Sequence, residues 1–400
     1  MKFETFKERL IKFKENTKFY KELYKDIDIT LLNSYEDMEI LPIITKEHLR
    51  NISYHDFIIE NEKKIVRIHS TSGSTGKPVI IPYTQNDIID WNNMFTRCLQ
   101  IADITDKDVV QVCTGYGLWT AGIGFQTAAE TIGATVVPMG PGNTDKQLKF
   151  IKEMKTSVIF ATASYVNILT EKIIEKPNEY SSLKIIITGG EKISNELWNK
   201  IETNLKVKVF SIYGLTEVYG PGIAISCNDS KKLHYFDDYL YFEIIDQLTK
   251  EKLKEGQVGE LVITTLNKDG FPLIRYNTND LSFIDSKKCT CGLLYPKIGP
   301  IFGRSDDMIK VKGVKLFPMD IEKILFENIG EYVEYIIEIE KFDKVFLKFE
   351  TTKNDYKKLE FKIRNEIKKM LGIYIYVNAI SINTLIRSEH KTNRVIDRRF

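Results

Sequence analysis

The sequence predicts an α/β protein with a large N-terminal domain, residues 1–305, and a small mobile α+β lid, residues 306–400. Between residues 65 and 267, short β-branched runs alternate with helical stretches, which is typical of βαβ units around a mixed, largely parallel sheet flanked by helices. Strands joined only by turns follow, and they predict a β-rich subdomain over about residues 225–300. A chain of 400 residues is also too long for one hydrophobic core.

The individual elements are predicted from apolar spacing. Residues 3–25 carry apolar side chains at helical intervals and predict a helix or a helical pair. The parallel strands are predicted at residues 109–112, 134–137, 158–160, 185–187 and 207–210. In the lid, strands are predicted at residues 333–339, 344–349 and 373–380, with a helix at about 356–371.

Composition and charge exclude several classes of protein. The apolar fraction of 43% and charged fraction of 28% are ordinary for a globular protein, and the net charge of +2 gives no reason to expect nucleic acid or a membrane as a partner. No run is long and apolar enough for a membrane span, and the N-terminus does not resemble a signal peptide. With five cysteines in such a chain, we expect a reducing, cytoplasmic location without disulfides.

Residues 70–78, Ser-Thr-Ser-Gly-Ser-Thr-Gly-Lys-Pro, form a glycine-rich loop that predicts phosphate binding. The common phosphate loop has glycine where this chain has Thr71, and it opens a helix. Here Pro78 and a β-branched run predict a strand instead. The loop therefore lies between strands, which points away from kinases and GTPases and toward enzymes that adenylate carboxylic acids.

Seven further segments occur in a characteristic order with this loop. They span residues 41–50, 115–122, 188–191, 213–217, 275–280, 303–310 and 391–397. From about residue 40 to the C-terminus, the chain resembles the adenylate-forming superfamily of acyl-CoA synthetases, nonribosomal adenylation domains and luciferases. Within it, the chain is most similar to the phenylacetate–CoA ligase branch.

The resemblance implies an ATP site. The loop would position the β- and γ-phosphates through Thr71, Ser72, Gly73, Ser74, Thr75, Gly76 and Lys77. Glu217 matches the magnesium ligand and Thr216 the α-phosphate contact, and a hard cation prefers carboxylate oxygen. Asp280 and Arg304 match the ribose contacts. Tyr213 would stack on adenine beside Gly190 and Glu191.

The resemblance also implies a moving lid. Lys391 matches the catalytic lysine, whose cation stabilises charge that develops in the transition state. Asp306 matches the hinge residue, and Gly313 would face the incoming thiol. The pattern departs from many relatives at Asn277, Asn279 and His390, although the catalytic residue types are intact. By the same resemblance, the acyl pocket would be lined by Tyr116, Trp119, Ala163, Tyr165 and Gly214.

Three cysteines and a histidine predict a structural zinc site. Cys227, His234, Cys289 and Cys291 supply a complete tetrahedral set of ligands, and the Cys-Thr-Cys-Gly turn resembles a metal knuckle. Because no coordination position stays open, the metal would pin the β-rich region and take no part in catalysis.

The predicted function is that of an ATP- and magnesium-dependent acid–thiol ligase. A carboxylic acid, expected to be aromatic, is adenylated, and coenzyme A then displaces AMP to give a thioester. One alternative is a stand-alone enzyme that loads the phosphopantetheine arm of an acyl or aryl carrier protein. A second is a non-catalytic nucleotide- or zinc-binding relative. The quaternary structure is left open, with a homodimer as one option.

Overall fold

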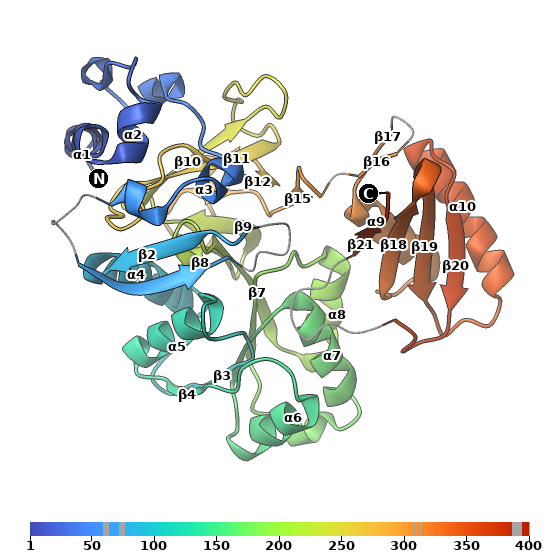
Figure 1. The fold of residues 1–400 in the computed structure, drawn as a ribbon. Helices are drawn as coiled ribbons and strands as arrows, with labels where there is room; N and C mark the ends of the chain where they lie inside the picture. The colour runs from blue at the N-terminus through green and yellow to red at the C-terminus, as the bar shows by residue number, and fades with distance from the viewer. Residues whose placement is uncertain (59–63, 72–76, 308, 312–313, 386–393, 400) are drawn as a thin grey trace.

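The structure, a computed structural model, describes residues 1–58, 64–71, 77–307, 309–311, 314–385 and 394–399 (Figure 1). Its N-terminal residues form a helical pair, as the apolar spacing predicted: α1 (Phe3–Asn16) and α2 (Lys18–Leu23). Phe6, Leu10 and Phe13 lie on the buried face of α1 and join the main apolar core. A short helix, α3 (Lys46–Arg50), follows just before the first strand.

A nine-stranded sheet in the order β13-β14-β9-β8-β7-β6-β5-β3-β4 is the frame of the large domain. Its parallel part confirms the predicted strands: β3 (Val109–Val112), β4 (Thr135–Val137), β5 (Val158–Ala161), β6 (Ile185–Thr188) and β7 (Lys208–Leu215). The central strands β5 and β6 are buried on both faces, as parallel strands between helical layers are.

Helices cover both faces of this sheet (Figure 1). Side chains alternate along each strand, so Phe160 packs into the core under α4 (Gln85–Ile101) and α5 (Ala121–Ile132). Ile159 points the other way, into a core formed with α6 (Thr144–Glu153), α7 (Ala163–Ile173) and α8 (Asn195–Leu205). The predicted α/β class is confirmed.

The segment that contains the glycine-rich loop joins two antiparallel strands, β1 (Ile65–Ser70) and β2 (Ile80–Thr84). The prediction of a strand after the loop is therefore correct. The Thr71 hydroxyl accepts the Val79 amide at 3.0 Å, and the Thr71 amide donates to the Val79 carbonyl at 3.1 Å. These two bonds close the base of the loop.

The β-rich region differs in one respect from the prediction. β10 (Leu240–Ile245), β11 (Gly259–Thr265), β12 (Tyr276–Ser282) and β15 (Gly303–Arg304) form a separate four-stranded antiparallel sheet. The large sheet, however, is extended by β8 (Gly220–Cys227), β9 (Ser230–Tyr235), β13 (Ile284–Asp285) and β14 (Lys297–Ile298). Part of residues 225–300 thus continues the large sheet, because hairpins can add to the edge of a parallel sheet.

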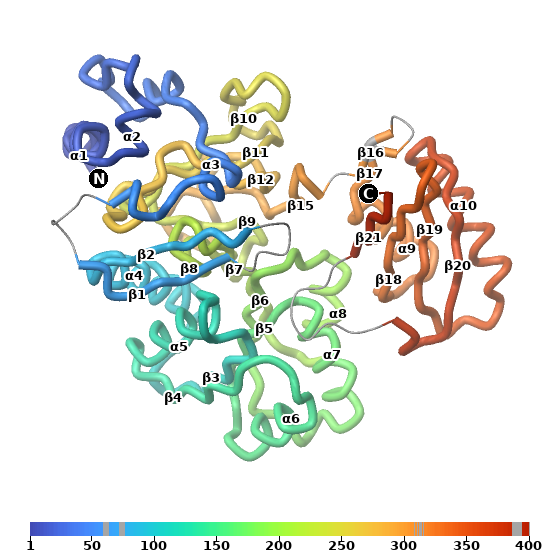
Figure 2. Tube along the Cα trace, viewed as in Figure 1, coloured from blue at the N-terminus to red at the C-terminus, as the bar shows by residue number. Residues whose placement is uncertain are grey.

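The C-terminal residues form a unit with its own apolar core, drawn in orange and red at the right of Figures 1 and 2. Its sheet, in the order β20-β19-β18-β21, contains β18 (Tyr335–Glu340), β19 (Lys344–Glu350), β20 (Tyr376–Ile380) and β21 (Val395–Asp397). The predicted helix is found as α10 (Tyr356–Leu371). The hairpin β16 (Ile309–Val311) and β17 (Val314–Leu316) and the helix α9 (Pro318–Ile329) were not predicted. Among the described residues, none of the helices has the length and apolar character to cross a membrane.

Candidate active site

The candidate site lies where two neighbouring parallel strands end. β6 leads into Gly189, Gly190 and Glu191, and β7 leads into Thr216 and Glu217. Open α/β sheets bind their ligands beyond these carboxyl ends. Both motifs therefore stand at the carboxyl ends of neighbouring parallel strands, as the sequence predicted.

Glu217 is the buried carboxylate of this edge, with only 4% of its surface exposed. Its Oε1 atom accepts a hydrogen bond from the Tyr276 hydroxyl at 3.3 Å and lies 3.0 Å from the Lys46 ammonium. The Thr216 hydroxyl lies 3.3 Å from that of Thr120. An ammonium and a hydroxyl group thus contact the same oxygen of this carboxylate.

Magnesium fits this arrangement. Mg²⁺ is commonly held by one or two carboxylates together with substrate phosphates, because it retains several water molecules as its other ligands. Glu217 supplies one such carboxylate, and its pairing with the Lys46 ammonium marks an anionic position. The residues therefore suit a metal that arrives with a nucleotide.

Four predicted residues form one continuous polar network. The Tyr213 hydroxyl donates to Asp280 Oδ2 at 2.6 Å, and burial, reinforced by the Asp280 carboxylate, raises the pKa of Tyr213 well above its ordinary value. Arg304 Nη1 lies 3.5 Å from Asp280 Oδ1, on the paired strands β12 and β15. The same guanidinium binds Asp306 with two bonds of 2.8 Å. The ribose candidates and the hinge candidate are thus in direct contact.

Gly190 and Glu191 lie beside the start of α7. Gly190 has φ +78°, a conformation that glycine adopts without strain, and no atom lies within 4 Å of the position a Cβ would take. Glu191 Oε2 accepts the backbone amide of Ser164 at 3.0 Å. This bond joins the β6 loop to the first turn of α7.

The predicted acyl-pocket residues lie in three different settings. Tyr116 is half-buried, and its hydroxyl has no hydrogen-bond partner among the residues that the structure describes. The Trp119 ring packs so close to Gly115 that a Cβ there would lie 2.6 Å from ring atom Cε3. Ala163 and Tyr165 are buried in the core under α7, where the Tyr165 hydroxyl lies 3.4 Å from the Gly142 carbonyl. Gly214 has a packing role, because its Cβ would lie 2.0 Å from the carbonyl oxygen of Gly220.

Several predicted residues cannot be placed. Lys77 is described and exposed, but Ser72, Gly73, Ser74, Thr75, Gly76, Gly313 and Lys391 lie outside the described residues. Sequence reasoning, in turn, assigned no role to three residues around Glu217, namely Lys46, Tyr276 and Lys268. Lys46 and Tyr276 do occur within motifs that carried the resemblance, whereas nothing local distinguishes Lys268.

The Cys/His set does come together. The ligand atoms of Cys227, His234, Cys289 and Cys291 all lie within 4.8 Å of one another. Cys227 Sγ is 3.6 Å from Cys289 Sγ, and Cys291 Sγ is 3.4 Å from His234 Nε2. His234 Nδ1 lies 3.0 Å from the Tyr295 carbonyl, which orients Nε2 toward the sulfurs. Two pairs of residues that lie 55 or more positions apart in the sequence thus form one compact donor set.

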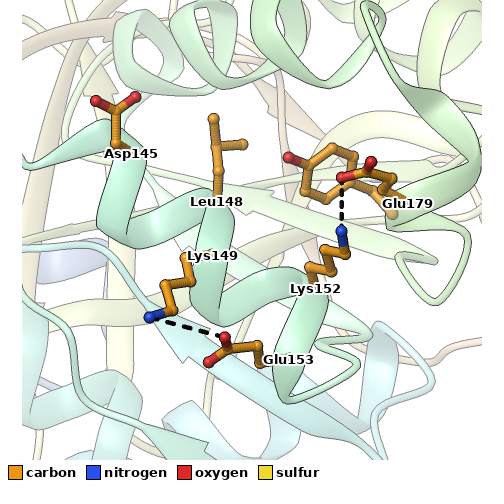
Figure 3. Close-up of a pocket in the computed structure, with 7 residues that line it drawn as sticks. Asp145, Leu148, Lys149, Lys152, Glu153 and Glu179 are labelled. Atoms are coloured by element: carbon orange, nitrogen blue, oxygen red, sulfur yellow. Dashed lines mark hydrogen bonds and ion pairs between the residues drawn. The ribbon is translucent and has the colours of Figure 1, made fainter.

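A surface hollow on the far part of the large domain has a different character. It has a volume of about 400 Å³ and is lined by side chains of α6 and of residues 179–180 (Figure 3). Lys152 is paired with Glu179 at 3.0 Å, and Lys149 with Glu153 at 3.8 Å, so four of its five charged side chains are paired with one another. It contains none of the candidate site residues.

Comparisons with known proteins agree with this geometry. The AMP-binding enzyme family matches residues 22–267, and the AMP-binding enzyme C-terminal domain matches residues 313–399. The chain belongs to the AMP-binding enzyme family. It is 37% identical to a phenylacetate–coenzyme A ligase of Pseudomonas putida, over 93% of this chain and 86% of the relative. It is 35% identical to the ligase of that name from Escherichia coli K12, over 91% of this chain and 86% of the relative.

Solved structures give the same fold. A 2-hydroxyisobutyryl-CoA ligase, in its postadenylation state with a bound acyl adenylate, superposes with a TM-score of 0.88 at 24% identity, covering 99% of this chain and 88% of that one. The predicted membership of the adenylate-forming superfamily, in its phenylacetate–CoA ligase-like branch, is confirmed. So is the predicted class of activity, an AMP-forming acid–CoA ligase that works through an acyl adenylate.

Proposed function

We propose that the chain activates an aromatic carboxylic acid with ATP and transfers the acyl group to coenzyme A. The observation that carries this proposal is the polar network of Tyr213, Asp280 and Arg304 in an AMP-binding enzyme, which begins on β7, the strand that leads into Glu217. The aromatic substrate is supported by the names of the relatives and by the Tyr116 and Trp119 side chains beside this edge. Aromatic rings favour offset or edge contacts with another ring.

Each site residue has a separate role in adenylation. Asp280 and Arg304 bind the ribose, Tyr213 stacks on adenine, and Thr216 contacts the α-phosphate. Glu217 would hold the magnesium ion, which when bound neutralises negative charge on the phosphates. Thr71, Lys77 and their loop receive the leaving pyrophosphate, while Lys391 stabilises the charge on the reacting groups. These assignments rest on the matched motifs and on the network described above.

Carboxylate-dependent ATP–pyrophosphate exchange tests the substrate class. We expect a panel of arylacetic and benzoic acids to give values of kcat/KM about tenfold or more above those of acetate, propionate and 2-hydroxyisobutyrate, because a ring buries far more apolar surface. Higher values for the short acids would contradict the aromatic assignment. Release of AMP with a carrier domain but not with coenzyme A would assign the phosphopantetheine arm of the carrier, in place of coenzyme A, as the acceptor.

We further propose that the Cys/His set holds a structural zinc ion. Zn–S bonds of about 2.3 Å in a tetrahedral site separate two sulfurs by about 3.8 Å. The observed 3.6 Å between Cys227 and Cys289 is close to that value. Four protein ligands close the coordination sphere, so the ion joins β8 and β9 to the turn at residues 289–292 and does not take part in the reaction.

Cys289→Ser/Cys291→Ser is expected to lose the metal. Purified protein should contain about one zinc per chain, and the double variant should contain almost none and melt at a lower temperature. Cys98→Ser is the matched control, since Cys98 is buried elsewhere and donates to the Gly222 carbonyl. Equal metal content in wild type and double variant, measured by elemental analysis after zinc supplementation, would contradict the site.

The remaining sequence predictions concern organisation. We propose a domain boundary near residues 305 and 306, which is supported by the separate apolar core of residues 309–379. A cytoplasmic location, a homodimer and a carrier-protein partner stay predictions.

A further inference from the structure

The turn that carries Glu217 is fixed by hydrogen bonds to its backbone carbonyl groups. This turn, residues 216–219, connects β7 to β8. The Tyr83 hydroxyl lies 3.2 Å from the Thr216 carbonyl and 2.6 Å from that of Tyr219. The Lys268 ammonium donates to the Glu217 carbonyl at 3.1 Å and to the Val218 carbonyl. Four consecutive carbonyls thus accept from two side chains.

Lys268 is wholly buried, which is rare for a lysine. Its ammonium lies 4.7 Å from the Tyr83 ring centroid, 5.0 Å from that of Tyr219 and 6.0 Å from that of Phe271. Aromatic faces attract a cation, and the attraction grows when water is excluded. The ammonium is therefore fixed between three rings and two carbonyls.

Other charged groups surround this ammonium. The Asp87 carboxylate on α4 accepts the amides of Asp269 and Gly270 at 2.7 and 2.9 Å, and so fixes the loop that carries Lys268. His69 on β1 lies edge-on to Tyr83, and burial, with a smaller effect of Lys268, lowers the pKa of His69. Around the ammonium stand the side chains of Glu217, Tyr83, Tyr219, Asp87, Asp269 and His69.

We propose that Lys268 is a positioning residue for adenylation, which holds the β7–β8 turn so that Thr216 and Glu217 face the nucleotide. The inference rests on the proposed function, in which Glu217 binds the metal that accompanies ATP. Lys268 touches neither reactant. It acts through the backbone of the turn, where a displacement of about 1 Å can lower a rate about 100-fold.

Lys268→Met tests the inference through both half-reactions and through binding. We expect adenylation to fall about 10- to 100-fold and the calorimetric affinity for magnesium–ATP to weaken. Thioester formation from preformed acyl adenylate should change less than about threefold, because that step follows loss of pyrophosphate. Equal losses in both half-reactions, or an unchanged affinity for magnesium–ATP, would overturn the proposal.

Two further variants make the test decisive. Lys7→Met is the matched control, because Lys7 also donates to two carbonyls, those of Thr30 and Leu32, far from the site. It should leave the ratio of the half-reactions unchanged. If Lys268→Met does not fold, Tyr83→Phe removes the other donor to the turn and should lower adenylation selectively. If the wild-type protein adenylates no acid, the proposed function is contradicted. The affinity for magnesium–ATP still tests the positioning role of Lys268 in that case.

Discussion

Glu217→Gln is expected to lower the adenylation rate about 100-fold or more, with little change in the fold. The substitution keeps the size and hydrogen bonding of the side chain but removes the charge that faces the Lys46 ammonium and the metal. Pyrophosphate exchange should need far more magnesium for its half-maximal rate. Magnesium titrations at saturating ATP and acid measure this directly.

Glu260→Gln is the matched control for this variant. Glu260 is also a buried carboxylate paired with a lysine, at 2.7 Å from Lys250 Nζ, and it accepts from Asn277. It lies on β11 and belongs to none of the proposed binding groups. Comparable stability of the two variants with a magnesium defect only in Glu217→Gln would support the assignment. The same magnesium dependence in both would contradict it.

Lys391→Ala is expected to lower adenylation about 100-fold or more and to spare the second half-reaction. The proposed ammonium stabilises charge that exists only while the carboxylate attacks the α-phosphate, so its loss should reduce kcat more than it raises KM. Coenzyme A should still consume preformed acyl adenylate at nearly the wild-type rate. Rapid-quench measurements of each half-reaction separate the two effects.

Lys369→Ala controls for a change of charge in the same unit. Lys369 lies on α10 and pairs only loosely, at 3.7 Å, with Glu366. This variant should match the wild type in both half-reactions, since isolated surface pairs contribute little. Equal loss of both half-reactions in Lys391→Ala would contradict a role confined to adenylation.

The sheet and its ligand-bearing edge could be predicted because their signals are local. β-branched runs such as residues 185–187 predict strands, and polar or glycine-containing motifs directly after them predict loops at the strand ends. The helix α10 was predicted with the right bounds, since its apolar side chains repeat at helical spacing before Gly372.

The omissions have physical reasons. The strands β13 and β14 contain two residues each, and they are defined by pairing with each other and with β9, which no local pattern encodes. Helix α9 did carry usable signals, with Pro318 at its start, Gly330 after its end and Ile321, Ile324 and Leu325 on one face. Lys268 could not be predicted as buried, because its partners come from distant segments.

The double contact of Arg304 has a thermodynamic consequence. One guanidinium joins Asp280, the proposed ribose acceptor, to Asp306, the proposed pivot. If a sugar that engages Asp280 alters the grip of Arg304 on Asp306, the coupling free energy must act equally in both directions. A rotation of the C-terminal unit that weakens the Arg304–Asp306 contact then changes the affinity for AMP by the same factor. The release of AMP and the reorientation of the C-terminal unit are therefore thermodynamically coupled.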